Sequence, residues 1–274
     1  MQEYTIRPFD FTQAASLVPL FKECFGRDVP SNYFQWKFLD NPAGPAIGHV
    51  AVTKEDETVG FYGMIPEYYR FGACEQMVHQ GCDVMTLPAH RRQGLFGRQF
   101  RATCEMGRTL SNRFTFMGFG GQTTISTYRK MGVTVPFSIP FYFKLAFLCR
   151  LPKLRRLDAP QEINAPNRLV LDMIQENASR RKNTKIFDDY FIQWRLKNPL
   201  IKYRILHDDS AYAIFYVAGS FIFLFDAWEA AKGKGRRVMS FLDNELTRAG
   251  KKGILTFGQE GGSLARHVRR HGFI

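Results

Sequence analysis

A short basic loop that contains glycine is the part of this sequence best suited to bind an anion. It follows an apolar segment and a proline, and it precedes a long segment with apolar residues at helical spacing. The first N–H groups of a helix have no partner within the helix and lie at the positive end of its dipole, so they can bind a phosphate. Glycine also lets the backbone approach an anion closely. The loop reads Arg91-Arg92-Gln93-Gly94-Leu95-Phe96-Gly97.

Two common phosphate-binding loops do not fit this segment. No Gly-Lys-Ser/Thr follows, which excludes a Walker A loop, and the glycine spacing is not that of a dinucleotide-binding GxGxxG. The loop instead resembles the signature of the GCN5-related N-acetyltransferases (GNAT superfamily), which is Gln/Arg-x-x-Gly-x-Gly/Ala between a strand and a helix. Arg91 fills its first position and Gly94 its glycine, whereas Phe96 stands where Gly or Ala is commonest, with Gly97 directly after.

The resemblance implies that acetyl-CoA is bound as a co-substrate and that no metal takes part. The loop amides would hold the pyrophosphate of coenzyme A. The backbone at 85–87 would run beside the pantetheine arm as an added strand, and the sheet would open between that strand and the next, at 113–118. The cofactor-binding residues would be Met85, Thr86, Leu87, Arg91, Arg92, Gln93, Gly94, Leu95, Phe96 and Gly97.

Tyr128 is the candidate general acid. Family members often carry a Tyr four residues before a Gly, and here Tyr128 precedes Gly132 by that spacing. The resemblance implies that this hydroxyl protonates the departing thiolate. A packing tyrosine on an amphipathic helix would fit the same pattern, and only geometry decides the role of an acid. Many relatives also carry an Asn seven residues before this Tyr, where this sequence has Gly121.

The general base has three candidates, because an acceptor amine must lose a proton directly or through water. Asp83 starts the segment that would hold the cofactor, and Glu67 lies in the neighbouring predicted strand. His79 has the side chain whose solution pKa is nearest neutrality. Each could equally be an ordinary polar residue at a strand edge, so the sequence leaves the choice open. No His–Asp/Asn set accompanies a cysteine, so we expect direct transfer without an acyl-enzyme.

The elements that would position these residues follow the order of a mixed α/β sheet. Antiparallel strands come before one strand–helix–strand crossover, which places parallel and antiparallel pairs in one sheet. The predicted strands are 4–8, 49–54, 58–71, 76–87, 113–118 and 133–148, the last of which could be a bent pair. The predicted helices are 11–25, 31–39, 93–110 and 123–131.

The second half of the chain repeats two features of the first. The motifs Gln-Trp-basic and Asn-Pro occur at 35–42 and recur at 193–199. Residues 118–132 also align with residues 258–272 at one constant offset, with matching glycines. Two repeats in the same order favour a duplication over chance.

We therefore predict a GNAT fold with two tandem domains. These are an acetyltransferase domain at 1–150, a linker at 151–166 and a second GNAT-like domain at 167–274. The second domain would be shortened or degenerate. It would also be non-catalytic, because Val268 occupies the place of Tyr128 and cannot donate a proton. We expect it to have a structural or acceptor-shaping role.

The composition is that of a globular protein with a strongly basic surface. With 45% hydrophobic residues in 274, the chain can bury a sizeable core, which excludes a disordered protein. A net charge of +13 attracts polyanions at long range without specifying which kind. Nucleic acid is one such partner, and a phosphate-rich cofactor or nucleotide-linked substrate is another.

The sequence also gives expectations about the compartment. No apolar run reaches the roughly 18 to 20 residues that a membrane helix needs, and the N-terminus lacks the pattern of a signal peptide. The five cysteines are odd in number and form no CxxC pair, which favours reduced thiols. We therefore expect a cytoplasmic protein without membrane association.

Two functions from different classes remain. The first is an N-acetyltransferase that acts on a primary amine of a small acceptor. The tandem arrangement resembles acetyltransferases of bacterial surface-sugar biosynthesis, which suggests an amino sugar, ahead of aminoglycosides, peptide or protein amines and polyamines. The second is a non-catalytic GNAT-like module that senses CoA or binds nucleic acid. Nucleic acid is not the partner that we expect, and the sequence does not fix the oligomeric state.

Overall fold

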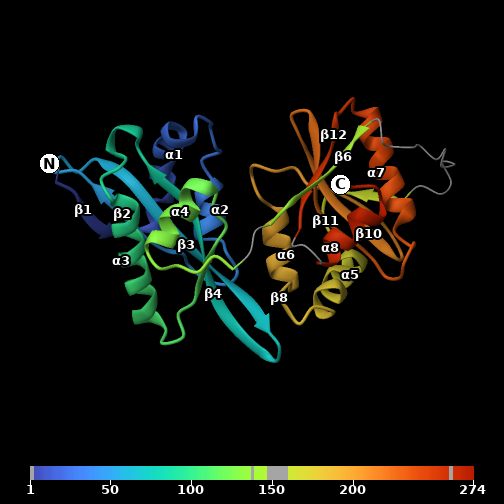
Figure 1. Ribbon diagram of the computed structural model, residues 1–274, viewed down its shortest axis with the longest axis horizontal. Coiled ribbons are helices and arrows are strands. Elements are labelled where there is room, and N and C mark those ends of the chain that lie inside the picture. Colours follow the sequence, from blue (N-terminus) through green and yellow to red (C-terminus); the bar gives the residue numbers. More distant parts are fainter. Residues whose placement is uncertain (1–2, 137–138, 147–159, 259–261) are drawn as a thin grey trace. The chain divides into compact units, whose positions relative to one another are not determined.

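The computed structural model describes residues 3–136, 139–146, 160–258 and 262–274 and divides the chain into two compact units (Figure 1). The first unit comprises Met1–Val135, Lys182–Ile186 and Lys197–Leu200. The second comprises Pro136–Arg181, Phe187–Leu196 and Ile201–Ile274. Each unit holds one six-stranded sheet. None of the helices in the described ranges is both long and apolar enough to span a membrane.

The first unit is a mixed sheet with the strand order β1-β2-β3-β4-β5, and β8 pairs with β3 as well. Only β4 and β5 run parallel, and α3 connects them. The strands are β1 (Thr5–Pro8), β2 (Ile47–Val52), β3 (Thr58–Phe71), β4 (Cys74–Thr86), β5 (Phe116–Gly118) and β8 (Asn183–Lys185). The helices are η1 (Phe11–Ser16), α1 (Leu17–Phe25), α2 (Tyr33–Phe38), η2 (Pro88–His90), α3 (Leu95–Leu110) and α4 (Gln122–Lys130).

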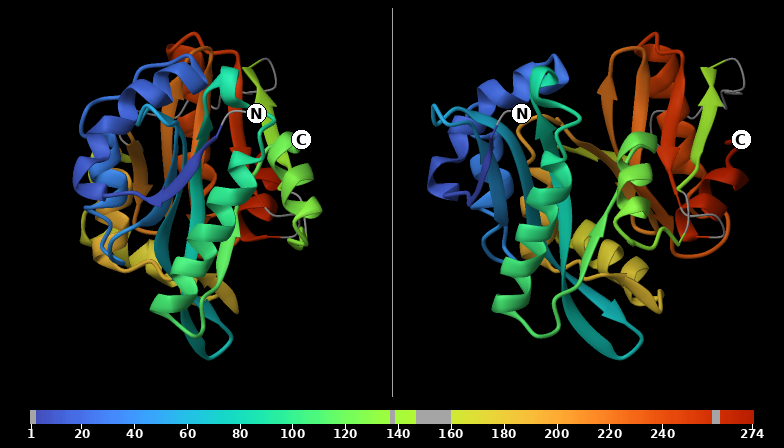
Figure 2. Two further views of the ribbon diagram at one scale, coloured as in Figure 1. Left: turned by 90° about the vertical axis from the view of Figure 1, so that its left-hand side faces the viewer. Right: turned by 60° about the vertical axis from the view of Figure 1, so that its left-hand side comes forward.

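Strand β3 shows how the two faces of this sheet are covered. Successive strand residues point to opposite faces. Accordingly, the Phe61 ring packs on Phe38 of α2, with ring centroids 5.5 Å apart, and the Tyr62 ring packs on Phe100 of α3, with centroids 5.7 Å apart. Helices α2 and α3 therefore cover opposite faces of the same sheet (Figure 2).

The second unit has the strand order β6-β12-β11-β10-β9-β7. Its one parallel pair, β11 with β12, is connected by α7. The strands are β6 (Phe141–Leu145), β7 (Gln161–Ile163), β9 (Arg204–Asp208), β10 (Ala211–Ala218), β11 (Phe221–Glu229) and β12 (Gly253–Phe257). The helices are α5 (Arg168–Ser179), α6 (Asp189–Leu196), α7 (Arg236–Arg248) and α8 (Ser263–Arg270).

The two units repeat one order of elements. Each has a strand, two helical segments, three antiparallel strands, a helix, a parallel strand and a last helix. Each also has a register shift in the hairpin before the parallel strand, between Phe61 and Gly63 in the first unit and between Ile214 and Phe215 in the second. The prediction of a mixed α/β fold with two sheets is confirmed.

Several segments differ in detail from the sequence-based expectation. The strand predicted at 133–148 is present only at Phe141–Leu145, and it pairs with β12 in the second sheet. Its positions 137, 138, 147 and 148 lie outside the described residues, as does most of the predicted linker, while β7 occupies part of that linker. Strand β8 was not predicted, because three polar residues carry no strand periodicity and only β3 holds them in place.

Candidate functional site

The loop before α3 presents a row of free backbone donors. Gly94 is the N-cap of α3, has a φ of 71° and provides no capping side chain. Among the described residues, the structure gives no hydrogen-bond acceptor for the amides from Arg92 to Gly97. A Cβ built on Gly94 would meet nothing within 4 Å, so the space beside Gly94 is open, whereas one built on Gly97 would lie 3.3 Å from the Met131 Sδ.

Positive side chains surround these donors. Arg91 and Arg92 are exposed, and the Arg91 Nε donates to the Thr86 carbonyl at 3.1 Å, which ties the loop to the end of β4. Free amides, a helix N-terminus and adjacent guanidinium groups together suit a pyrophosphate. The residues present therefore fit the phosphate end of coenzyme A.

Strands β4 and β5 pair only over His79–Gly81 and Phe116–Gly118. Beyond Gly81, β4 continues to pair with β3, but it has no described neighbour on its other side. Asp83 adopts a φ of 47° where the β3–β4 register shifts, so a bulge marks the point of separation. The sheet thus opens at the place that the resemblance predicted, with Met85 and Thr86 on the free edge.

Tyr128 of α4 reaches this point of separation. Its side chain is 6% exposed, and its hydroxyl oxygen lies 2.8 Å from the hydroxyl oxygen of Tyr62 on β3. A Cβ built on Gly81 would lie 2.5 Å from the Tyr62 hydroxyl and 3.4 Å from that of Tyr128. One built on Gly118 would lie 3.7 Å from the Tyr128 hydroxyl. The paired hydroxyls therefore lie beside the last two residues that join β4 to β5.

The environment of the two hydroxyls separates their acidities. Burial raises the pKa of Tyr128, and the hydrogen bond from Tyr62 acts in the opposite direction. Burial and the neighbouring Tyr128 both raise the pKa of Tyr62. Either hydroxyl can donate in this bond, but Tyr62 can donate to a Tyr128 phenolate, which makes Tyr128 the group better able to release a proton. Sequence reasoning missed Tyr62, because nothing in the spacing of its strand distinguishes it from a core tyrosine.

Asp83, one of the candidate bases, forms an ion pair. Its Oδ2 lies 2.6 Å from the Nζ of Lys37 on α2, and the same Nζ donates to the Tyr33 hydroxyl at 3.2 Å. Burial lowers the pKa of Lys37, but Asp83, Cys82 and Tyr33 together outweigh burial and the pKa is raised. Lys37 therefore stays charged and holds the Asp83 carboxylate in place. In the sequence, Lys37 is distinguished only as the basic residue of the repeated Gln-Trp-basic motif.

Glu67, the second candidate, is also paired. It is 3% exposed, its Oε1 lies 2.6 Å from the Lys185 Nζ, and its Oε2 accepts from the Tyr69 hydroxyl at 3.4 Å. Both Glu67 and Asp83 act electrostatically on the thiol of Cys82, whose pKa burial raises to about 12. Asp83 adjoins Cys82 on β4, whereas Glu67 lies opposite Val78, and a thiol of that pKa is a poor nucleophile.

His79, the third candidate, lies in apolar surroundings. Its ring centroid is 5.1 Å from that of Phe114, and its Nδ1 is buried without a partner among the described residues. Burial lowers the pKa of His79, which keeps the imidazole neutral. The structure therefore places His79 beside Phe114, on the stretch of β4 that pairs with β5.

The corresponding loop of the second unit is already occupied by the chain itself. The Oε2 of Glu229, at the end of β11, accepts from the amides of Gly233 and Gly235 at 3.0 Å each. Val268, at the position that aligns with Tyr128, is fully buried. In the second unit, the Gly233 and Gly235 amides of this loop are therefore already occupied, and residue 268 has no proton to donate.

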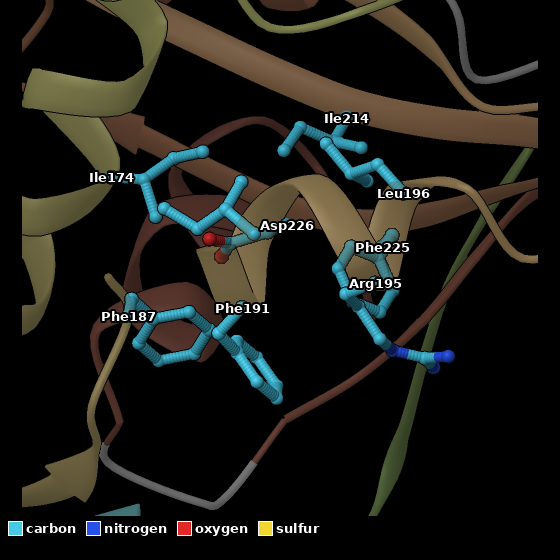
Figure 3. Close-up of a pocket in the computed structure, with 9 residues that line it drawn as sticks. Ile174, Phe187, Phe191, Arg195, Leu196, Ile214, Phe225 and Asp226 are labelled. Carbon is cyan, nitrogen blue, oxygen red and sulfur yellow. The ribbon is translucent and has the colours of Figure 1, made fainter. Parts of the chain in front are cut away.

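The second unit also contains a small, half-open pocket (Figure 3). Its walls are mostly apolar, and Asp226 and Arg195 are its charged residues. The Asp226 carboxylate accepts from the Tyr212 hydroxyl at 2.7 Å, and burial raises its pKa. The Arg195 guanidinium lies 5.3 Å from the centroid of Phe225 and, in Figure 3, points away from Asp226. Both polar groups of the pocket thus have partners within the unit.

No protein-family model matches the sequence, and no curated protein matches it. Solved structures show the fold. A GCN5-related N-acetyltransferase from Anabaena variabilis matches 94% of this chain and 66% of its own, with a TM-score of 0.68 and 14% identity. A conserved Enterococcus faecalis protein described as a probable N-acyltransferase matches 93% and 65%, with a TM-score of 0.65 and 11% identity. A glucosamine N-acetyltransferase region of a fungal multi-domain β-N-acetylglucosaminidase matches 100% and 37%, with a TM-score of 0.62 and 10% identity.

These structures share their fold with the chain, at low sequence identity. The chain therefore has the fold of the GCN5-related N-acetyltransferases, as its loop sequence indicated. It spans just under two thirds of the length of the Anabaena and Enterococcus proteins.

Proposed function

We propose that the chain is an N-acyltransferase that uses acetyl-CoA and a primary amine of a small acceptor. One observation carries the proposal: free amides at the start of α3 and the buried Tyr128 hydroxyl belong to a single opening between β4 and β5. The amides would hold the pyrophosphate, and the free edge of β4 at Met85 and Thr86 would pair with the pantetheine arm. The thioester would then lie where the strands part.

The proposed reaction is a direct transfer. The amine nitrogen forms a bond to the acyl carbon, the carbon–sulfur bond breaks, and the sulfur leaves as a thiolate. Tyr128 gives its proton to that sulfur, and the hydrogen bond from Tyr62 stabilises the phenolate that remains. A base takes the proton that the amine loses. Asp83 and Glu67 remain the stronger candidates, because their carboxylates flank the β4–β5 pairing: Asp83 lies at the bulge beyond Gly81, and Glu67 lies opposite Val78.

An amino sugar is the acceptor that we propose. The carboxylates of Glu67 on β3 and Asp83 on β4 suit a small, polar, amine-bearing molecule. One solved structure with this fold is described as a glucosamine N-acetyltransferase region. The net charge of +13 disfavours a polycationic acceptor such as a polyamine, because like charges repel on approach.

Thermal unfolding with and without acetyl-CoA tests the cofactor assignment, because a ligand that binds only the folded state raises the midpoint. Acetyl-CoA should raise it, whereas acetyl-pantetheine at equal concentration, which lacks the pyrophosphate, should raise it much less. No shift with millimolar acetyl-CoA would exclude the assignment.

Release of free thiol with a panel of amino sugars, aminoglycosides, peptides and polyamines then tests transfer. A thermal shift without turnover of any amine would favour a CoA-sensing module instead. Steeply salt-dependent binding to random nucleic acid, again without turnover, would favour a nucleic-acid-binding module.

A further inference from the structure

Three metal-ligating side chains converge in the second unit. Glu229 ends β11, His267 lies on α8, and His271 follows that helix directly. Residues four apart lie on one face of a helix, so the two imidazoles lie side by side, with ring centroids 4.8 Å apart. One ligand atom from each of the three residues lies within 4.8 Å of the others.

The imidazoles have polar atoms that no protein group satisfies. His267 is 4% exposed, and neither of its ring nitrogens has a hydrogen-bond partner in the described part of the chain. The Nε2 of His271 is buried and unpartnered in the same sense. A buried polar atom without a partner costs about 1 to 3 kcal/mol, so such a group points to a bound ion or water. Three such nitrogens beside one carboxylate have the composition of a metal site.

The two carboxylate oxygens of Glu229 have separate partners. The Oε2 accepts from the amides of Gly233 and Gly235 at 3.0 Å, which fixes the plane of the carboxylate. The Oε1 is thereby directed toward the histidines and lies 3.7 Å from the Nδ1 of His267. Outer hydrogen bonds of this kind orient the ligands of protein metal sites.

We propose that Glu229, His267 and His271 form a site for a first-row divalent cation, with zinc as the best fit. Two imidazoles and one carboxylate are a known zinc ligand set that leaves a fourth position open, and zinc takes such ligands at about 2.0 to 2.2 Å. Tetrahedral bonds of that length would bring the donor atoms to roughly 3.3 Å from one another. The side chains would therefore move together by about an ångström. Calcium and magnesium prefer oxygen ligands and fit less well.

One cation competes with the proposed ion. The Arg270 Nη1 lies 3.2 Å from the Glu229 Oε1, the same oxygen that would bind the metal. The Arg270 side chain is 48% exposed, so it can turn into solvent when the metal binds. Lys144, a buried cation near His271, is already neutralised by Asp243 at 2.6 Å. Replacing Arg270 should therefore strengthen metal binding, whereas replacing a ligand should weaken it.

The experiment uses the full chain after dialysis against EDTA and then a metal-free buffer. Zinc binding is followed by calorimetry, and cobalt is added separately, because its visible spectrum reports tetrahedral nitrogen and oxygen coordination. We expect one zinc per chain and a rise in the thermal midpoint. His271→Ala should weaken zinc binding at least about 100-fold, and Arg270→Gln should bind zinc as tightly as the unchanged chain or more tightly.

Matched variants keep the test decisive. His90→Gln removes a histidine from the first unit and should leave zinc binding unchanged. His267→Gln is measured beside His271→Ala, and circular dichroism shows which of the two folds. The proposal is overturned if the unchanged chain binds no stoichiometric zinc. In that case, water molecules would be the partners of the His267 and His271 ring nitrogens. The proposal is also overturned if zinc affinity is the same in folded His271→Ala or His267→Gln as in the unchanged chain.

Discussion

The hydroxyl oxygens of Tyr62 and Tyr128 lie 2.8 Å apart, although the two residues are 66 positions apart in the sequence. Tyr62 comes from the middle of the sheet and Tyr128 from the helix that follows β5. Their hydrogen bond joins a core side chain to the proposed proton donor. The activity of Tyr128 should therefore depend on Tyr62 as well.

Replacement of either tyrosine tests this dependence. Tyr128→Phe removes the proton donor and should lower kcat at least about 100-fold, with little change in the Kd for acetyl-CoA. Tyr62→Phe keeps Tyr128 as the proton donor but removes the hydrogen bond that lowers the pKa of Tyr128. Because Tyr128 acts in its protonated form, the alkaline limb of the kcat profile should then move to higher pH. Unchanged turnover in Tyr128→Phe would remove Tyr128 from the mechanism.

Gly81 should be intolerant of even a methyl group. An added Cβ would lie 2.5 Å from the Tyr62 hydroxyl, which is held in a closely packed core. We expect Gly81→Ala to lower the free energy of unfolding by about 1 to 3 kcal/mol, the usual cost of overpacking. Gly121→Ala is the control, since a Cβ there meets nothing within 4 Å. Equal stability of the two variants in chemical denaturation would contradict the packing of this hydroxyl pair.

Lys37 and Asp83 should behave as a coupled pair. Their side chains are 15% and 11% exposed, so loss of one partner leaves a largely buried charge. Lys37→Met should lower the free energy of unfolding by about 3 kcal/mol, and Lys37→Met with Asp83→Asn should lower it less than the sum of the single changes. Denaturant unfolding of the four proteins measures the coupling, and strict additivity would contradict the ion pair.

The Asp83→Asn variant also tests whether Asp83 is the general base. If Asp83 removes the proton from the amine, Asp83→Asn should lower kcat at least about 100-fold at every pH. A normal rate in a folded Asp83→Asn protein would leave Glu67 as the stronger candidate.

The part of the site that depends on local backbone could be predicted from the sequence. The proline, the glycine and the helix pattern around Gly94 are adjacent in the chain, and so is the order of strands that builds the mixed sheet. The partners of the candidate side chains could not be predicted, because they depend on sheet register and helix packing. Tyr62 meets Tyr128, and Lys37 meets Asp83, only after the helices lie on the sheet. The ligand set of Glu229 and His267 is likewise split between a strand and a distant helix.

The loop that precedes α3 is expected to bind acetyl-CoA, whereas the loop that precedes α7 is not. The first has free amides, whereas Glu229 occupies the amides of the second. We therefore expect isothermal calorimetry to give one acetyl-CoA per chain. Gly94 and Gly233 form a matched pair, because both have positive φ values, 71° and 88°, and a Cβ on either would meet nothing within 4 Å.

The matched substitutions separate cofactor binding from backbone strain. Gly94→Ala and Gly233→Ala should each lower the free energy of unfolding by roughly 1 to 2 kcal/mol, because both force alanine into the left-handed region. Gly94→Ala should also raise the Kd for acetyl-CoA about tenfold or more, because its methyl group and the strained backbone displace the amides that would bind the pyrophosphate. Gly233→Ala should leave that Kd unchanged. Two molecules bound per chain, or an equal loss of affinity in both variants, would show that the second loop also binds the cofactor.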